Sequence, residues 1–140
     1  MASKTEMFRT QHKDLLGIVG QLRHLLDPTK LAKDGAPART LLNQLAGKLN
    51  VHLAMEDKSL YPQLLKYKDP AVQAKAKTFM DQMGGIKEAF GAYMAKYPSA
   101  QVIEKAAAAF VSDSEGLAKV VAKRMQSEDM DLYALVDRLG

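Results

Sequence analysis

The sequence predicts an all-α fold, specifically an up-down-up-down antiparallel four-helix bundle. The composition favours helix, because Trp is absent, aromatic residues make up only 6%, and Ala, Leu, Lys, Met and Gln dominate. Hydrophobic residues make up 47%, which is enough for a core. Apolar residues recur at steps of three and four along four stretches, as on one face of an α-helix. Short links between these stretches favour antiparallel neighbours. A length of 140 residues suits one domain, so we expect a single bundle over residues 1–140.

The first two helices are predicted on either side of a segment rich in helix breakers. The first stripe consists of Phe8, His12, Leu15, Val19, Leu22 and Leu26. The segment DPTKLAKDGAPA (27–38) then predicts a loop, because it contains two prolines and a glycine. The second stripe consists of Leu42, Leu45, Leu49, His52 and Glu56. Pro62 should kink or end this helix, since proline lacks the N–H that continues the backbone ladder.

The third and fourth helices follow two further breaks. Pro70, at the end of KYKDP (66–70), is well placed near a helix start. The third stripe consists of Val72, Ala76, Phe79, Met83, Ile86, Phe90, Tyr93 and Tyr97. Gly84 and Gly85 weaken it locally, and the YPS segment (97–99) breaks it, with Ser99 as a candidate N-cap. The fourth stripe consists of Leu117, Val121, Arg124, Glu128, Leu132 and Leu135.

The two halves of the chain resemble each other. The segment FRTQH (8–12) is similar to FMDQM (79–83), at an offset of 71 residues. The segment HLAMEDKSLY (52–61) is similar to RMQSEDMDLY (124–133), at an offset of 72 residues. The shared ED–x–x–LY ending favours a true internal repeat. It pairs the first helix with the third and the second with the fourth.

The composition argues against several classes of function. The net charge is +4, but the basic residues are scattered singly, so we expect no nucleic-acid partner. The absence of cysteine excludes disulfides and thiolate chemistry and suits a reducing compartment. No hydrophobic signal core and no membrane-spanning run is found, so we expect a soluble, cytoplasmic protein without a membrane partner. Without a glycine-rich phosphate loop or a nucleophile elbow, a dedicated catalytic role is not indicated.

Five polar residues interrupt the otherwise apolar stripes: His12, His52, Glu56, Arg124 and Glu128. Charged groups at bundle core positions are costly unless they are paired or bind a metal. A step of four places His52 and Glu56 on one helix face, and likewise Arg124 and Glu128. The H-x-x-x-E spacing alone is weak evidence, since a surface pair has the same spacing. Histidine and carboxylate on several stripes together predict a metal site in the bundle interior, where di-iron proteins build theirs.

The chain resembles the hemerythrin family of the HHE cation-binding type. The resemblance covers nearly the whole sequence and rests on His12, on HLAMEDKSLYP (52–62) and on EDMDLY (128–133). The family pattern has a histidine on helices 1 and 3 and H-x-x-x-E on helices 2 and 4. The resemblance implies a four-helix bundle that holds a non-haem di-iron centre with bridging carboxylates. It also implies binding of dioxygen or nitric oxide, or sensing of iron, oxygen or redox state.

The sequence departs from this pattern at two positions. Met83 stands at the helix 3 histidine and Arg124 at the helix 4 histidine. The family's second iron takes both of these histidines, so one set is missing as a unit. The resemblance therefore implies a site reduced to one ion, most simply iron, with Zn or Mn as alternatives. Its ligands would be His12, His52, Glu56 and Glu128, and it would serve binding or sensing rather than reversible oxygen carriage.

Two alternatives remain open at the level of sequence. In a metal-free bundle that acts as an interaction or ligand-binding module, Arg124 would form a buried salt bridge with Glu56 or Glu128. In an intact di-iron site, substitute ligands would replace the missing histidines. Met83 is a poor candidate, because a thioether suits softer metals and a core role is simpler.

Several further residues near the stripes could bind a metal or support its ligands, and each also has a simpler role. Asp57 and Asp129 adjoin the stripe carboxylates and could turn inward, although we expect them to be solvated. Tyr61 and Tyr133 follow in both halves of the repeat, and packing is the simpler expectation for them, with support of the ligands as the alternative. His24 lies off the first stripe and is expected at the surface.

Overall fold

The structure is a computed structural model that describes residues 5–139. Within that range every element of secondary structure is a helix, so the all-α prediction is confirmed. The predicted domain limits at residues 1 and 140 lie outside the described residues. None of the helices in the described range is long and apolar enough to cross a membrane.

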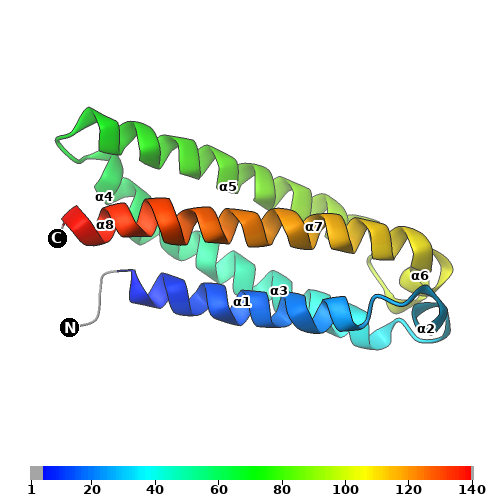
Figure 1. Ribbon diagram of the computed structural model, residues 1–140. Coiled ribbons are helices and arrows are strands. Elements are labelled where there is room, and N and C mark those ends of the chain that lie inside the picture. The colour runs from blue at the N-terminus through cyan, green and yellow to red at the C-terminus, as the bar shows by residue number, and fades with distance from the viewer. Residues whose placement is uncertain (1–4, 140) are drawn as a thin grey trace.

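Four helices of 19 to 27 residues form most of the described chain. They are α1 (Glu6–His24), α3 (Ala36–Met55), α5 (Pro70–Lys96) and α7 (Ala107–Ser127). Figure 1 shows them along a common direction, with α2 and α6 at one end and α4 and α8 at the other. Helix α1 contacts α3 and α7, and α5 contacts α7. The short helices are α2 (Pro28–Lys33), α4 (Tyr61–Leu65), α6 (Ala100–Lys105) and α8 (Tyr133–Leu139).

Capping explains two departures from the predicted boundaries. The loop predicted over residues 27–38 is wrong for most of its length, because α2 forms within it and α3 begins at Ala36. Asp27 accepts hydrogen bonds from two backbone N–H groups at the start of α2, and Pro28 suits the first turn. Ser99 is an N-cap as predicted, but it caps the short helix α6. Helix α7 begins separately, because Ala106 leaves helical geometry with φ −123° and ψ 40°.

Pro62 does not end the second long helix, although it marks a change in it. The chain passes from α3 through the π-helical segment η1 (Glu56–Leu60) into α4. Pro62 lies in the first turn of α4, where a missing N–H costs little. A second π-helical segment, η2 (Glu128–Leu132), joins α7 to α8 in the same way. Gly84 and Gly85 stay helical within α5.

Two apolar clusters form the core, and the polar layer lies between them. The larger cluster includes Leu15, Leu53 and Met125, and the smaller includes Phe8, Leu60 and Leu132. In three of the four long segments, one site residue separates the two clusters: His12 in α1, Glu56 after α3 and Glu128 after α7. Helix α5 contributes apolar residues to both clusters without a site residue between them. A polar layer enclosed by apolar residues on both sides is shielded from water, so its charges must be balanced within the layer.

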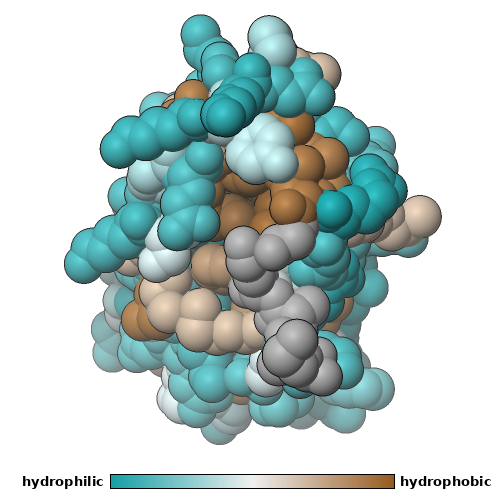
Figure 2. Space-filling model, turned by 90° about the vertical axis from the view of Figure 1, so that its left-hand side faces the viewer, coloured by the Kyte–Doolittle hydropathy of each residue, from teal (hydrophilic) through white to brown (hydrophobic). Residues whose placement is uncertain are grey.

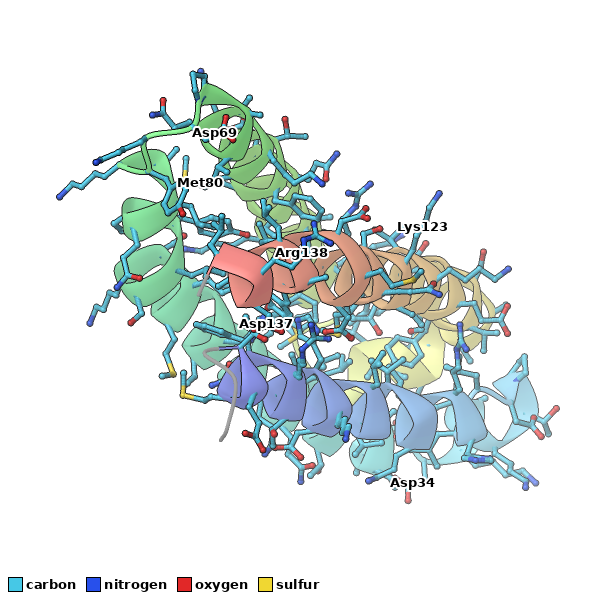
Figure 3. The ribbon with its side chains drawn as sticks, turned by 60° about the vertical axis from the view of Figure 1, so that its left-hand side comes forward. Asp34, Asp69, Met80, Lys123, Asp137 and Arg138 are labelled. Atoms are coloured by element: carbon cyan, nitrogen blue, oxygen red, sulfur yellow. The ribbon has the colours of Figure 1, made fainter. Side chains whose placement is uncertain are left out.

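At the end of the molecule near α4 and α8, polar contacts join the two terminal helices. Asp137 of α8 (Figure 3) accepts from Thr5 Oγ1 at 2.9 Å and from Arg9 Nη2 at 3.3 Å. Figure 2 looks onto this end and shows hydrophobic side chains at its centre within a rim of hydrophilic ones. Leu135 and Leu139 of α8 are partly buried against the smaller core cluster. These contacts hold α1 and α8 together close to the polar layer.

Candidate metal centre

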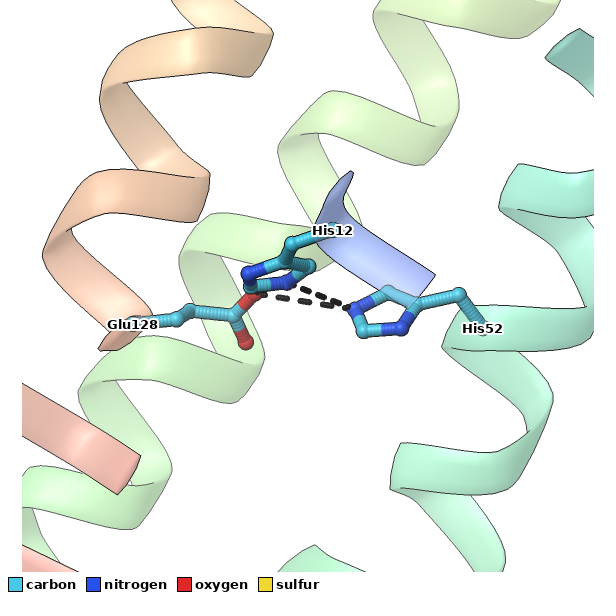
Figure 4. Close-up of side chains that lie close together, drawn as sticks. All are labelled: His12, His52 and Glu128. Carbon is cyan, nitrogen blue, oxygen red and sulfur yellow. Dashed lines mark hydrogen bonds and ion pairs between the residues drawn. The ribbon is translucent and has the colours of Figure 1, made fainter. Parts of the chain in front are cut away.

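Two histidines and a glutamate converge within the polar layer (Figure 4). Helix α1 carries His12, α3 carries His52 and η2 begins with Glu128, and each is at most 1% exposed. His12 Nε2 is 3.0 Å from His52 Nε2 and 3.1 Å from Glu128 Oε1. His52 Nε2 is 3.8 Å from the same carboxylate oxygen. The three residues form a group that could hold a metal ion, because each presents one ligand atom to the other two.

Glu56 joins this group from the side of His52. Its Oε1 atom lies 3.2 Å from His52 Nε2, and the side chain is fully buried. Among the described residues, this oxygen has no hydrogen-bond partner. A buried carboxylate oxygen without a partner is costly. The position of Glu56 Oε1 therefore suits contact with a cation next to His52.

Both glutamates stand at the start of a π-helical segment. In η1 and η2, the N–H of the following tyrosine bonds to the carbonyl of the glutamate five residues earlier. The wider turn shifts the helical phase by one residue. As a result, the last leucine of each segment and the tyrosine after it, Tyr61 or Tyr133, are both buried. The repeat seen in the sequence is thus also present in the backbone.

The outer nitrogens of both histidines contact hydrogen-bond acceptors. His12 Nδ1 lies 3.0 Å from Asp129 Oδ1, and His52 Nδ1 lies 2.6 Å from Gln11 Oε1. The Gln11 amide is oriented by Met55, whose sulfur accepts from Gln11 Nε2 at 3.2 Å. A carboxylate and an amide oxygen can only accept, so both Nδ1 atoms donate. In the neutral imidazoles, the inner Nε2 atoms then carry lone pairs, which is the tautomer a metal ion requires.

The outer oxygens of both glutamates are held by tyrosines. Tyr133 Oη donates to Glu56 Oε2 at 2.8 Å, and Tyr61 Oη donates to Glu128 Oε2 at 3.3 Å. Tyr133 Oη is also 3.3 Å from His12 Nε2. Burial, reinforced by both carboxylates, raises the pKa of each tyrosine, so both remain protonated donors. The expectation that these tyrosines only pack is therefore wrong.

Protons balance the charges of the layer when they are the only cations available. Burial disfavours a charged His52, but the neighbouring carboxylates of Glu128 and Glu56 outweigh it and raise the pKa of His52 to about 9. Burial raises the pKa of Glu56 to about 8, and the neighbouring Glu128 carboxylate adds to this. Burial would also raise the pKa of Glu128, but the neighbouring imidazoles of His12 and His52 outweigh it and lower the pKa to about 2. At neutral pH, protons on His52 and Glu56 thus take the place of a cation.

Arg124 does not join the polar layer, contrary to the prediction. Its side chain is half-buried and donates to Gln82 Oε1. In the described part of the chain, no ion pair links it to Glu56 or Glu128. In the equivalent pair of the first half, His52 and Leu53 are both buried, whereas here only Met125 is, at 1% exposed. The predicted salt bridge of Arg124 in a metal-free module is wrong for the same reason.

Because of this position, we expect Arg124→Ala to be a mild change. The variant loses one hydrogen bond to a neutral amide, worth about 0.5–1.5 kcal/mol. Stranding a buried carboxylate would instead cost about 3–5 kcal/mol. Urea denaturation with and without chelator measures the difference, and Gln82→Ala is the matched control with a similar small loss. A loss above about 3 kcal/mol would show that Arg124 neutralises a carboxylate after all.

A pocket of about 290 Å³ lies on the side of the polar layer where the two histidines of the family pattern are missing. Its lining consists of Leu53, Asp57, Tyr61, Met80, Met83, Gly84 and Lys87. In the repeat, Met83 and Asp57 are equivalent to His12 and Asp129. Met83 is 3% exposed and belongs to the larger core cluster, as expected for a core methionine. Asp57 is exposed, as predicted, whereas its equivalent Asp129 is half-buried against His12.

The sequence pointed to the inner residues of the site but not to all of their supports. His12, His52 and Glu128 come together as expected, and His24 is exposed as expected. Gln11 was missed altogether, and Asp129 was expected in solvent. Gln11 precedes the stripe histidine by one residue, so no helical spacing marked it. The repeated ED pair was the only signal that could have indicated Asp129.

Comparison with known proteins agrees with this geometry. The family model of the hemerythrin HHE cation-binding domain matches residues 3–136. No curated protein and no solved structure matches the chain. The resemblance inferred from the histidines and the repeated ED–x–x–LY segments is confirmed, because the match covers nearly the full length. The chain therefore belongs to the hemerythrin HHE cation-binding domain family.

Proposed function

We propose that this protein binds a single metal ion through His12, His52 and Glu128, with Glu56 as a fourth ligand. One observation carries the proposal. Two Nε2 atoms and a carboxylate oxygen converge within 3.8 Å, while both outer nitrogens face acceptors. Such a set of lone pairs is stable only with a cation or protons among them. Two imidazoles and two carboxylates suit Fe(II), Zn(II) or Mn(II), and iron is our first choice.

The capacity for one ion follows from the loss of the second histidine pair. Met83 lies in the apolar core and Arg124 contacts Gln82, so neither replaces a histidine ligand. An iron ion here would supply a centre able to bind a small diatomic molecule such as dioxygen or nitric oxide. Reversible oxygen carriage by two irons is not part of the proposal. The role that we propose is binding or sensing rather than catalysis.

The protein's own groups would prepare the site for the ion. Asp129 and Gln11 hold the two imidazoles in the required tautomer. The apolar clusters on both sides exclude water from the layer. The protons on His52 and Glu56 would be released when the ion binds, because a metal ligand must be deprotonated.

We propose an up-down-up-down antiparallel four-helix bundle that forms one domain over residues 1–140. The placement of short connections at alternating ends in Figure 1 supports this topology. The absence of cysteine and the scattered basic residues support a cytoplasmic protein without a nucleic-acid partner.

Metal counting tests the proposed function. Protein purified without a nickel column and reconstituted anaerobically with Fe(II) should contain about one equivalent by elemental analysis, as expected for one set of imidazole ligands. The His12→Ala variant should lose it, while His24→Ala is a matched control at an exposed histidine and should retain it. Two equivalents in the wild type would support a di-iron site. None after reconstitution would support the metal-free module.

A further inference from the structure

Tyr61 and Tyr133 bind the two glutamates of the site crosswise. Tyr61, from the first half of the repeat, donates to Glu128 of the second half at 3.3 Å. Tyr133, from the second half, donates to Glu56 of the first half at 2.8 Å. Each tyrosine stands five residues after the glutamate of its own half. The two hydrogen bonds are therefore equivalent under the internal repeat.

Each carboxylate consequently has two oxygens with different neighbours. The Oε1 atoms face the histidines, at 3.2 Å from His52 Nε2 for Glu56 and 3.1 Å from His12 Nε2 for Glu128. The Oε2 atoms accept from the phenol hydroxyls. A carboxylate bridges two cations when each oxygen directs a lone pair at one of them. Here a phenol hydrogen occupies the approach to each second oxygen.

We infer that Tyr61 and Tyr133 limit the site to one ion, by donating to the carboxylate oxygens that a second ion would require. This inference rests on the proposed function, since it presupposes one ion at the Oε1 side. The tyrosines would act as positioning and specificity-determining residues, and neither would need to contact the ion. A phenol hydroxyl is ordinarily protonated at neutral pH, so both tyrosines can donate to the carboxylates.

The far side of Tyr61 offers no imidazole, and its one carboxylate, that of Asp57, belongs to an exposed side chain and shares the pocket lining with the Lys87 ammonium. Tyr61 lines the pocket of about 290 Å³ next to Met83, in the half that lacks histidines. A thioether is a poor ligand for a hard cation in an oxygen-rich site. The capacity of the site is thus restricted twice, by the missing imidazoles and by the hydroxyls on the carboxylates. The two restrictions can be removed separately by substitution.

Counting Co(II) in tyrosine variants tests the inference. Tyr→Phe substitution keeps the ring and removes only the hydroxyl. The Tyr61→Phe/Tyr133→Phe variant should show a second, weaker Co(II) binding event by calorimetry, whereas wild type should show one. Tyr93→Phe is the matched control, because the buried Tyr93 hydroxyl lies 2.6 Å from Ser114 Oγ in the other core cluster. It should bind one Co(II), like the wild type.

Restored histidines sharpen the test. Arg124 is equivalent to His52 in the repeat and contacts Gln82 as His52 contacts Gln11, so a histidine can take the same place there. The Met83→His/Arg124→His variant should still retain one Co(II) after desalting, because the hydroxyls remain. Addition of Tyr61→Phe and Tyr133→Phe should raise the retained Co(II) to about two equivalents, since both imidazoles and both oxygens are then free. Thermal melts establish that each variant is folded. If the fourfold variant does not fold, the tyrosine pair in the native background decides.

Three outcomes have distinct meanings. Two retained Co(II) ions in the Met83→His/Arg124→His variant would overturn the role of the tyrosines and leave the single native site intact. A single event in every folded tyrosine variant would overturn it as well. A wild type that binds no Co(II) would overturn the proposed function itself, and the inference with it.

Discussion

Glu128→Gln should weaken metal binding more than any other single conservative substitution in the protein. Glu128 is the carboxylate that approaches both histidines, at 3.1 Å and 3.8 Å. Burial would raise its pKa, but the neighbouring imidazoles of His12 and His52 outweigh burial and lower it to about 2, so Glu128 is ionised at neutral pH. Glutamine has the same size but lacks the charge that balances a cation. We expect a loss above the roughly 100-fold that removal of an outer hydrogen bond costs at most.

Competition with a chromophoric chelator would measure this loss for Zn(II) or Co(II). Glu56→Gln should have a smaller effect, because Glu56 approaches only His52 and stands outside the compact group of three. Glu104→Gln is the matched control, since Glu104 accepts from the Gly35 N–H at 2.8 Å near α2 and α6, far along the chain from the site. Equal losses for Glu56→Gln and Glu128→Gln would mean that both carboxylates are equivalent ligands.

The inner residues of the site could be predicted from the sequence, because the core positions of a helical bundle recur at steps of three and four and are normally apolar. A polar residue on an apolar stripe is conspicuous, and His12, His52, Glu56 and Glu128 all stand on stripes and are all buried. The same spacing wrongly placed Arg124 in the polar layer. Helical period alone does not distinguish residue 124 from residue 125 when both lie near the edge of an apolar stripe. Packing decides between them, and Met125 fills the core position.

The supporting residues were harder to predict, because they depend on local backbone geometry. In a regular α-helix, Tyr61 and Tyr133 would point away from the helix face that carries the glutamate five residues earlier. The π-helical segments insert one residue in each turn and bring both tyrosines into the interior. Propensity and periodicity carry no signal for such a turn. The repeated spacing from glutamate to tyrosine indicated only that the two halves would behave alike.

Stability without metal should fall as the pH rises from about 6.5 to 8, while metal affinity should rise. Burial lowers the pKa of His52, but the carboxylates of Glu128 and Glu56 outweigh it and raise the folded value from 6.5 to about 9. Burial raises the folded pKa of Glu56 from 4.5 to about 8. Both folded values exceed the unfolded ones, so the folded protein holds more protons. Their contribution to stability is present at low pH and is lost as the pH rises toward these values. Between pH 6.5 and 8, both groups contribute to the loss, which urea denaturation in the presence of chelator would measure.

The same protons determine how steeply the metal affinity rises with pH. An ion displaces them from His52 and Glu56, and each released proton steepens the rise in affinity by about tenfold per pH unit. Two protons correspond to about 100-fold per pH unit at most. Calorimetry with Zn(II) in two buffers of different ionisation enthalpy would count them. Glu56→Gln removes one titrating group and should lower the count by about one, whereas Glu104→Gln should leave it unchanged. An affinity that is constant between pH 6.5 and 8 would show that His52 and Glu56 are not the groups that the ion displaces.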